Sequence, residues 1–265
     1  MRNLVMTLIA CLLFTFSTSL LTAQTGKDRL YQITTTEIHP SKLRDYEKAV
    51  TKLGEAMVAA EVTTVELHAN RTNDLTYYYA EPINNMEELF TNKWIPIIEK
   101  VGEKKFMDLF SKVLACEKTR RDDFYLYKAA LSHYHPSLKG QSQNYRVWTA
   151  YQFKPGSQKE AEALSKAAKA IYQKHDIAMN YSIYFGVLGE NSNIVLWLET
   201  AKDALTYAQQ KAKANKKLWA DSEFQALNAR LLAILDKMEI KRGYYLPEFS
   251  NVPKVTTAVA EKEDE

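Results

Sequence analysis

The chain has 265 residues, of which 46% are apolar and 25% are charged. The formal net charge is only +3, because 35 basic residues are interspersed with 32 acidic ones. No basic patch indicates a nucleic-acid-binding protein, and the apolar content is sufficient for a core that needs neither metal nor disulfide.

The N-terminus has the layout of a secretory signal peptide. Arg2 precedes an apolar run, Leu4–Leu21, and the small residue Ala23 comes before a polar stretch. A membrane anchor and lipoprotein processing at Cys11 are the alternatives. Hydroxyl side chains interrupt the run, however, and only ten residues precede Cys11, so cleavage near Ala23 is favoured. We therefore predict a signal peptide over 1–23 and a periplasmic or secreted protein without membrane contact.

Residues 24–132 form the first predicted repeat, which alternates between strand and helix patterns. Leu43, Tyr46 and Val50 recur at three and four residues, as on one buried face of a helix. Pro96 and Gly102 predict a break in the second helix. The predicted strands are Leu30–Ile38, Thr63–Ala69, Leu75–Ala80 and Phe124–Ala129, and the predicted helices are Ser41–Ala60 and Met86–Cys116.

Residues 133–144 are predicted to be a linker. In an extended chain His133 and His135 would point to the same side, as pairs of metal ligands do. The surrounding segment nevertheless contains Pro136 and Gly140 and has no apolar periodicity. These features favour a solvated linker over a metal site.

Residues 145–250 repeat the pattern of the first part, and residues 251–265 are predicted to be a disordered tail because they are polar and acidic at the end. The predicted strands are Tyr145–Phe153, Asn180–Leu188, Ile194–Thr200 and Glu239–Leu246, and the predicted helices are Gln158–His175 and Lys202–Lys237.

The two parts read as copies of one unit. Each begins with a strand, a proline and an amphipathic helix, at Pro40 and at Pro155. The spacing from the end of the third strand to the last helix is also the same, since Glu81 to Phe106 and Glu199 to Phe224 both span 25 residues. A fixed offset of this kind indicates a tandem repeat.

Each copy has the order βαββαβ of the ferredoxin-like motif, in which helices cover one face of an antiparallel sheet. The other face would be exposed unless a second layer covered it. We therefore predict an α+β protein whose two sheets pack together into a pseudo-dimeric α/β barrel within a monomer.

This pattern resembles the dimeric α/β-barrel superfamily, including NIPSNAP, EthD and antibiotic-biosynthesis-monooxygenase-like domains. The resemblance is carried by the helix starts at Ile38–Lys42 and Phe153–Gly156, and the second of these is similar to the superfamily's xPGK motif. It implies pockets between sheet and helices in each half. It also implies a range of activities that includes cofactor-free oxygenases, haem-degrading enzymes and haem peroxidases.

His68 and Glu66 are the best catalytic candidates. In a strand they would share one face with Thr64, opposite Val65 and Leu67. If the apolar set meets the helices, the polar set faces the space between the sheets, where a carboxylate could orient a general base. The alternative is a satisfied polar interior or an edge strand in water.

Aromatic residues on strands are the candidates for ligand contact. They pack well on sheets in any case, but they could also line a pocket for an apolar or aromatic molecule. The residues singled out are Tyr78, Tyr151, Tyr184, Trp148 and Trp197.

The chain contains no glycine-rich phosphate loop, nucleophile elbow, His-Glu-x-x-His or Cys-x-x-Cys motif. Cys116, which remains after signal removal, is interpreted as a packing residue. We therefore predict a protein that binds a small apolar or aromatic ligand in a pocket between sheet and helices, without a metal or cofactor. A cofactor-free or haem-linked monooxygenase-like enzyme and a partner-binding protein remain as alternatives.

Overall fold

A computed structural model describes residues 27–62, 65–89, 94–188 and 192–252. The predicted signal peptide lies outside these ranges, so export stays a prediction. Most of the predicted tail also lies outside them. Asn251, however, forms an isolated antiparallel bridge with Leu67, in which the backbones of the two residues exchange hydrogen bonds. The folded part therefore extends past the predicted end at residue 250.

The strands and helices follow the predicted order in both halves. In the first half the elements are β1 (Arg29–Ile38), α2 (Leu43–Ala59), β2 (His68–Thr72), β3 (Thr76–Ile83), α3 (Ile95–Val101), α4 (Glu103–Leu114) and β4 (Glu117–Tyr127). In the second half they are β5 (Tyr145–Phe153), α5 (Gln158–Lys174), β6 (Asn180–Leu188), β7 (Ile194–Ala201), α6 (Ala204–Leu218), α7 (Ser222–Ile234) and β8 (Leu235–Tyr245).

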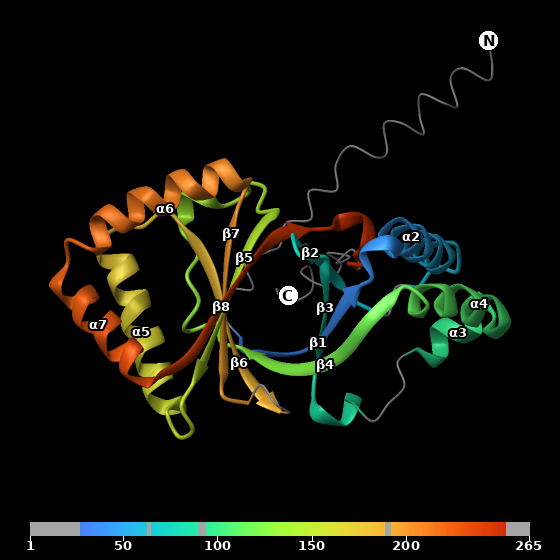
Figure 1. Cartoon of the computed structure of the whole chain (residues 1–265), viewed down its shortest axis with the longest axis horizontal. Coiled ribbons are helices and arrows are strands. Elements are labelled where there is room, and N and C mark those ends of the chain that lie inside the picture. Colours follow the sequence, from blue (N-terminus) through green and yellow to red (C-terminus); the bar gives the residue numbers. More distant parts are fainter. Residues whose placement is uncertain (1–26, 63–64, 90–93, 189–191, 253–265) are drawn as a thin grey trace, which may run out of the picture.

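The strands form one closed barrel in the order β1-β3-β2-β8-β5-β7-β6-β4. Two antiparallel pairs, β2 with β8 and β4 with β6, join the halves. The helices lie outside the barrel in two groups, with α2, α3 and α4 against the first half and α5, α6 and α7 against the second (Figure 1). The predicted α+β pseudo-dimeric barrel is confirmed.

The helices form where apolar periodicity and capping agree. Tyr46, Ala49 and Met57 are buried on one face of α2, as their spacing predicts. Asp203 and Asp221 are the N-caps of α6 and α7, where their side chains accept hydrogen bonds from backbone N–H groups that no helical carbonyl can reach. The predicted break in the second helix is confirmed, because Gly102 separates α3 from α4 with a φ of 90°.

Three strands differ most from the prediction. The second strand begins at His68 instead of Thr63 and continues to Thr72, through residues that resemble a turn in sequence. In both halves the last strand begins earlier than predicted, at Glu117 and at Leu235. These early stretches are charged and mostly exposed, so they lack the apolar alternation by which strands are recognised.

The segment predicted to be a linker, 133–144, is exposed at most of its positions, but His133 and Leu138 are buried. His133 is 6% exposed, bridges Tyr181 in β6, and its Nε2 lies 3.2 Å from the carbonyl oxygen of Ile177. Burial lowers the pKa of His133. The hydroxyl of Tyr134 contacts Ser182 Oγ at 2.6 Å and the Tyr127 hydroxyl at 3.2 Å. This segment therefore covers one end of the barrel.

Within the described ranges, none of the helices has the length and apolar content needed to cross a bilayer.

Gly243 in β8 allows the two halves to join. A Cβ atom at this position would lie 1.8 Å from the carbonyl oxygen of Arg71, at the β2–β8 pair. We expect Gly243→Ala to lower the free energy of unfolding by about 3 kcal/mol, as measured by denaturant unfolding. Gly54→Ala in α2 is the control, since nothing lies within 4 Å of its Cβ position, and it should raise stability by about 0.5 kcal/mol. Equal effects of the two substitutions would contradict this account of the seam.

Candidate functional site

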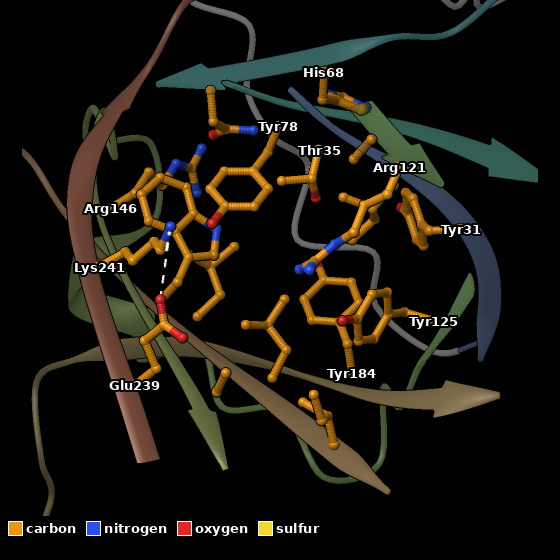
Figure 2. Close-up of a pocket in the computed structure, with 18 of the residues that line it drawn as sticks. Tyr31, Thr35, His68, Tyr78, Arg121, Tyr125, Arg146, Tyr184, Glu239 and Lys241 are labelled. Atoms are coloured by element: carbon orange, nitrogen blue, oxygen red, sulfur yellow. Dashed lines mark ion pairs between the residues drawn. The ribbon is translucent and has the colours of Figure 1, made fainter. Parts of the chain in front are cut away.

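The barrel encloses a cavity of about 740 Å³. Its wall comes from both halves, and the labelled aromatic rings of Tyr31, Tyr78, Tyr125 and Tyr184 point into it (Figure 2). This volume is in the range of ordinary small-molecule sites. The apolar and aromatic part of the wall consists of Tyr31, Ile33, Tyr78, Ala80, Tyr125, Trp148, Ala150, Tyr184, Ile194, Leu196, Leu198 and Tyr245.

Strand alternation explains which residues reach the cavity. In β5, Trp148 and Ala150 line it, whereas Val147 is buried on the face toward the helices. Ala80 in β3 and Ala150 in β5 occupy wall positions with side chains too small to reach across the barrel. The two sheets therefore pack without filling the space between them.

The aromatic rings of the two halves contact one another across the cavity. Tyr78 and Trp148 have ring centroids 5.6 Å apart, and Tyr31 and Tyr184 have centroids 5.8 Å apart. Burial raises the pKa of Tyr31 to about 12 and also raises the pKa of Tyr78, Tyr125 and Tyr184. At neutral pH these phenols are therefore neutral groups that donate hydrogen bonds and do not act as bases.

The predicted catalytic pair, His68 and Glu66, is brought together at the edge of the cavity. His68 lines the cavity, and its Nε2 lies 2.8 Å from the carboxylate of Glu66. Glu66 precedes β2 and also accepts a hydrogen bond from Arg29 at 3.0 Å. The hydrogen bond from His68 lowers the pKa of Glu66, which keeps this carboxylate ionised. Nδ1 of His68 is buried without a partner among the described residues.

Charged side chains on the wall were not singled out from the sequence. Lys241 in β8 pairs with Asp74 at 3.0 Å, and Arg121 in β4 pairs with Asp123 at 3.0 Å. Arg146 in β5 is 4% exposed and forms no ion pair with a described carboxylate. The sequence signal that marks Arg146 is its position two residues before Trp148, which places both on one face of the strand.

The other two ligand candidates lie elsewhere. Tyr151 and Trp197 pack against the core between the second sheet and its helices. There Trp197 lies on Tyr181, with centroids 4.0 Å apart. These rings fill the space beneath α5 and α7. Among the seven predicted site residues, the structure thus unites His68, Tyr78, Trp148 and Tyr184 on the cavity wall, with Glu66 beside them.

A second cavity, of about 1060 Å³, lies between α2 and the outer face of the first sheet. This is the location that the resemblance implies. Its principal polar groups already have partners, because the Tyr46 and Tyr79 hydroxyls are 2.7 Å apart and Thr34 donates to Asp122. The corresponding space in the second half is filled by the core that contains Tyr151 and Trp197.

Haem, which the resemblance brings in as a cofactor, requires an axial ligand such as histidine. Of the described histidines, only His68 lines the barrel cavity. The Nε2 atom of His68 is hydrogen-bonded to Glu66. Its other ring nitrogen, Nδ1, is bonded to the ring carbon that carries the Cβ atom. The described part of the chain also contains no cluster of three or more metal-binding side chains. Among the described residues, the wall of the barrel cavity therefore offers a haem no imidazole Nε2 that is free of a partner.

The fold is that of the dimeric α/β-barrel proteins, as the resemblance predicted. An anthrone oxidase-like protein is similar over 89% of this chain and 98% of its own, with a TM-score of 0.59 and 14% identity. Candidate monooxygenases from Fusobacterium nucleatum and Lactobacillus acidophilus have TM-scores of 0.51 and 0.50 and identities of 14% and 12%. They cover 82% and 83% of this chain and 92% and 94% of their own. At these identities the similarity establishes the fold alone.

No protein-family model and no curated protein matches the sequence.

The Glu66 interactions lead to a pH-dependent prediction. The pKa of Glu66 is lowered in the folded state, so its stabilisation is present above the unfolded carboxyl pKa of about 4.3 and is lost as the pH falls through the folded-state pKa. Glu66→Gln should therefore lower the free energy of unfolding by about 1 kcal/mol at pH 7. The difference from wild type should shrink below about pH 4.

Urea unfolding at several pH values measures this difference. Glu99→Gln is the control, because Glu99 lies exposed on α3, and it should change little at any pH. A Glu66→Gln effect that is constant from neutral to acidic pH would show that the carboxylate charge is not responsible.

Proposed function

We propose that the chain binds a small aromatic molecule inside the barrel. The observation that carries this proposal is the cavity of about 740 Å³ with aromatic rings from both halves in its wall. Flat rings such as Tyr78 and Trp148 offer a large contact area to an aromatic ligand. Interior positions occupied by Ala80 and Ala150 leave room for that ligand.

The barrel cavity is a better candidate than the cavity beneath α2. Two buried nitrogen atoms on residues of the barrel wall, His68 Nδ1 and Arg146 Nε, have no partner among the described residues. Buried polar atoms normally have hydrogen-bond partners, and exceptions are frequent where a ligand supplies one. Beneath α2 the Tyr46–Tyr79 pair is already satisfied without a ligand.

Monomeric state and export are part of the same proposal. A barrel closed within one chain leaves no sheet edge that a second copy must cover, which supports a monomer. The signal-like N-terminus supports a periplasmic or secreted site of action.

Filling the cavity should block binding. We expect the neutral dye N-phenyl-1-naphthylamine to bind wild type with a Kd of about 10 µM, and Ala150→Phe to weaken this at least about tenfold because the added ring occupies the ligand's volume. Dye fluorescence measures the affinity. Ala229→Phe, a matched change on the exposed face of α7, should leave it unchanged. Undiminished binding by a folded Ala150→Phe variant would place the dye outside the barrel.

The Glu66–His68 pair favours a second candidate function, which is cofactor-free oxygenation of an aromatic ketone. The Glu66 carboxylate orients the imidazole, and His68 Nδ1 can take a proton from a carbon made acidic by a neighbouring carbonyl group. The resulting carbanion can then react with dioxygen. Anthrone is a suitable test compound, because its oxidation consumes one dioxygen and yields one anthraquinone and one water.

We expect this activity to depend on His68. Oxygen uptake with anthrone should fall at least about 100-fold in His68→Ala, since general-base catalysis contributes roughly two to four orders of magnitude. His39→Ala is the control, because His39 is exposed before α2 and outside the barrel. Oxygen uptake that equals the uncatalysed rate with wild type would restrict the protein to binding.

A further inference from the structure

Arg146 is a buried cation that has no anionic partner among the described residues. Its side chain lies on the cavity wall, 4% exposed, and is labelled near Tyr78 and Lys241 in Figure 2. Among the described residues, its Nε has no hydrogen-bond partner and no carboxylate influences its pKa. Apart from burial itself, the groups that influence the pKa of Arg146 are the phenols of Tyr184, Tyr245 and Tyr134.

Arg146 differs in this respect from the other cations of the wall. Each of those has a carboxylate partner within the described part of the chain. The pairs are Arg120 with Glu117 at 3.2 Å, Arg121 with Asp123 at 3.0 Å, Lys237 with Glu239 at 3.7 Å, and Lys241 with Asp74 at 3.0 Å. The wall therefore carries a single positive charge that no described carboxylate neutralises.

An unpaired buried charge lowers the stability of the folded state, so its presence calls for a functional explanation. The ring of Tyr245, whose centroid lies 5.4 Å from the guanidinium carbon, offsets only part of this through a cation–π contact. Burial lowers the pKa of Arg146, but guanidinium groups stay protonated in proteins at neutral pH. A planar guanidinium is well suited to a carboxylate or sulfonate, which it can bind through two parallel hydrogen bonds.

The position of Arg146 gives the ligand an orientation. Arg146 is the second residue of β5, at the end of the barrel that Tyr134 covers. Lys237 in β8 and Arg121 in β4 are exposed residues of the wall. In each strand a buried tyrosine, Tyr245 or Tyr125, lies closer to the other end. A ligand entering past Lys237 and Arg121 would therefore reach Arg146 with its leading group.

We infer that the ligand is an aromatic monoanion, with a carboxylate or sulfonate paired to Arg146 and an aromatic body among Tyr78, Trp148 and Tyr184. This inference rests on the proposed binding function and specifies its ligand class. One unpaired cation matches one negative charge, and the remaining wall is aromatic and aliphatic.

Two dyes with the same ring skeleton test the charge directly. 8-Anilinonaphthalene-1-sulfonate differs from N-phenyl-1-naphthylamine only by its sulfonate group. Wild type should bind the sulfonate at least about tenfold more tightly, as a charge-assisted hydrogen bond predicts. Arg146→Met should abolish this preference while changing the Kd of the neutral dye less than about threefold. Arg146→Lys should retain part of the preference, because it keeps the charge but not the planar geometry.

A control and a stability measurement complete the test. Arg242→Met removes an arginine that is exposed in β8 and should leave the preference intact. Without ligand, Arg146→Met should raise the melting temperature, because it removes an unpaired buried charge. A lower melting temperature would assign Arg146 a structural role and overturn the inference. Equal binding of both dyes by wild type and Arg146→Met would overturn it too, but would leave the binding function standing. Failure of both dyes to bind wild type would refute the binding function itself.

Discussion

The structure depends on the need to cover the inner faces of two sheets. A ferredoxin-like unit buries only one face of its sheet beneath helices, and an exposed apolar sheet of that size is unstable in water. In this chain each unit covers the inner sheet face of the other, and the β2–β8 and β4–β6 pairs join the two sheets. These pairs also leave the barrel without a free strand edge. The close approach of Gly243 to Arg71 shows how tightly one of these seams is packed.

Closing the barrel does not fill it, and the two halves use their remaining space differently. In the second half, aromatic residues such as Tyr181 and Trp197 form a dense core between sheet and helices. In the first half, a cavity remains beneath α2. Between the sheets lies the barrel cavity, on whose wall buried nitrogen atoms of His68 and Arg146 have no partner in the part of the chain that the structure describes. Since such atoms reduce stability, their presence inside the barrel indicates a binding site more strongly than the volume alone.

The sequence was sufficient to predict the repeat, the order of elements and the barrel, because all three follow from periodicities that local sequence carries. It was less informative where strands run through polar stretches, as at the starts of β4 and β8. There the charged residues are mostly exposed, so their pattern resembles that of any solvated surface. The burial of His133 within the predicted linker could not be predicted, because its contacts, with Tyr181 and Ile177, are made to residues distant in sequence.

The site was predictable to the extent that strand alternation decides it. His68, Tyr78, Trp148 and Tyr184 face the cavity, but the equally aromatic Tyr151 and Trp197 face the helices. A shift of one residue in register exchanges the two faces, and residue type alone does not distinguish them. Arg146 was missed because whether an arginine is paired depends on neighbours from other strands.

A crystal structure of the protein with bound N-phenyl-1-naphthylamine tests the central claim most directly. The account predicts that the dye lies inside the barrel, with its naphthalene ring in contact with Tyr78 and Trp148. Dye bound beneath α2, against Tyr46 and Tyr79, with an empty barrel would contradict it.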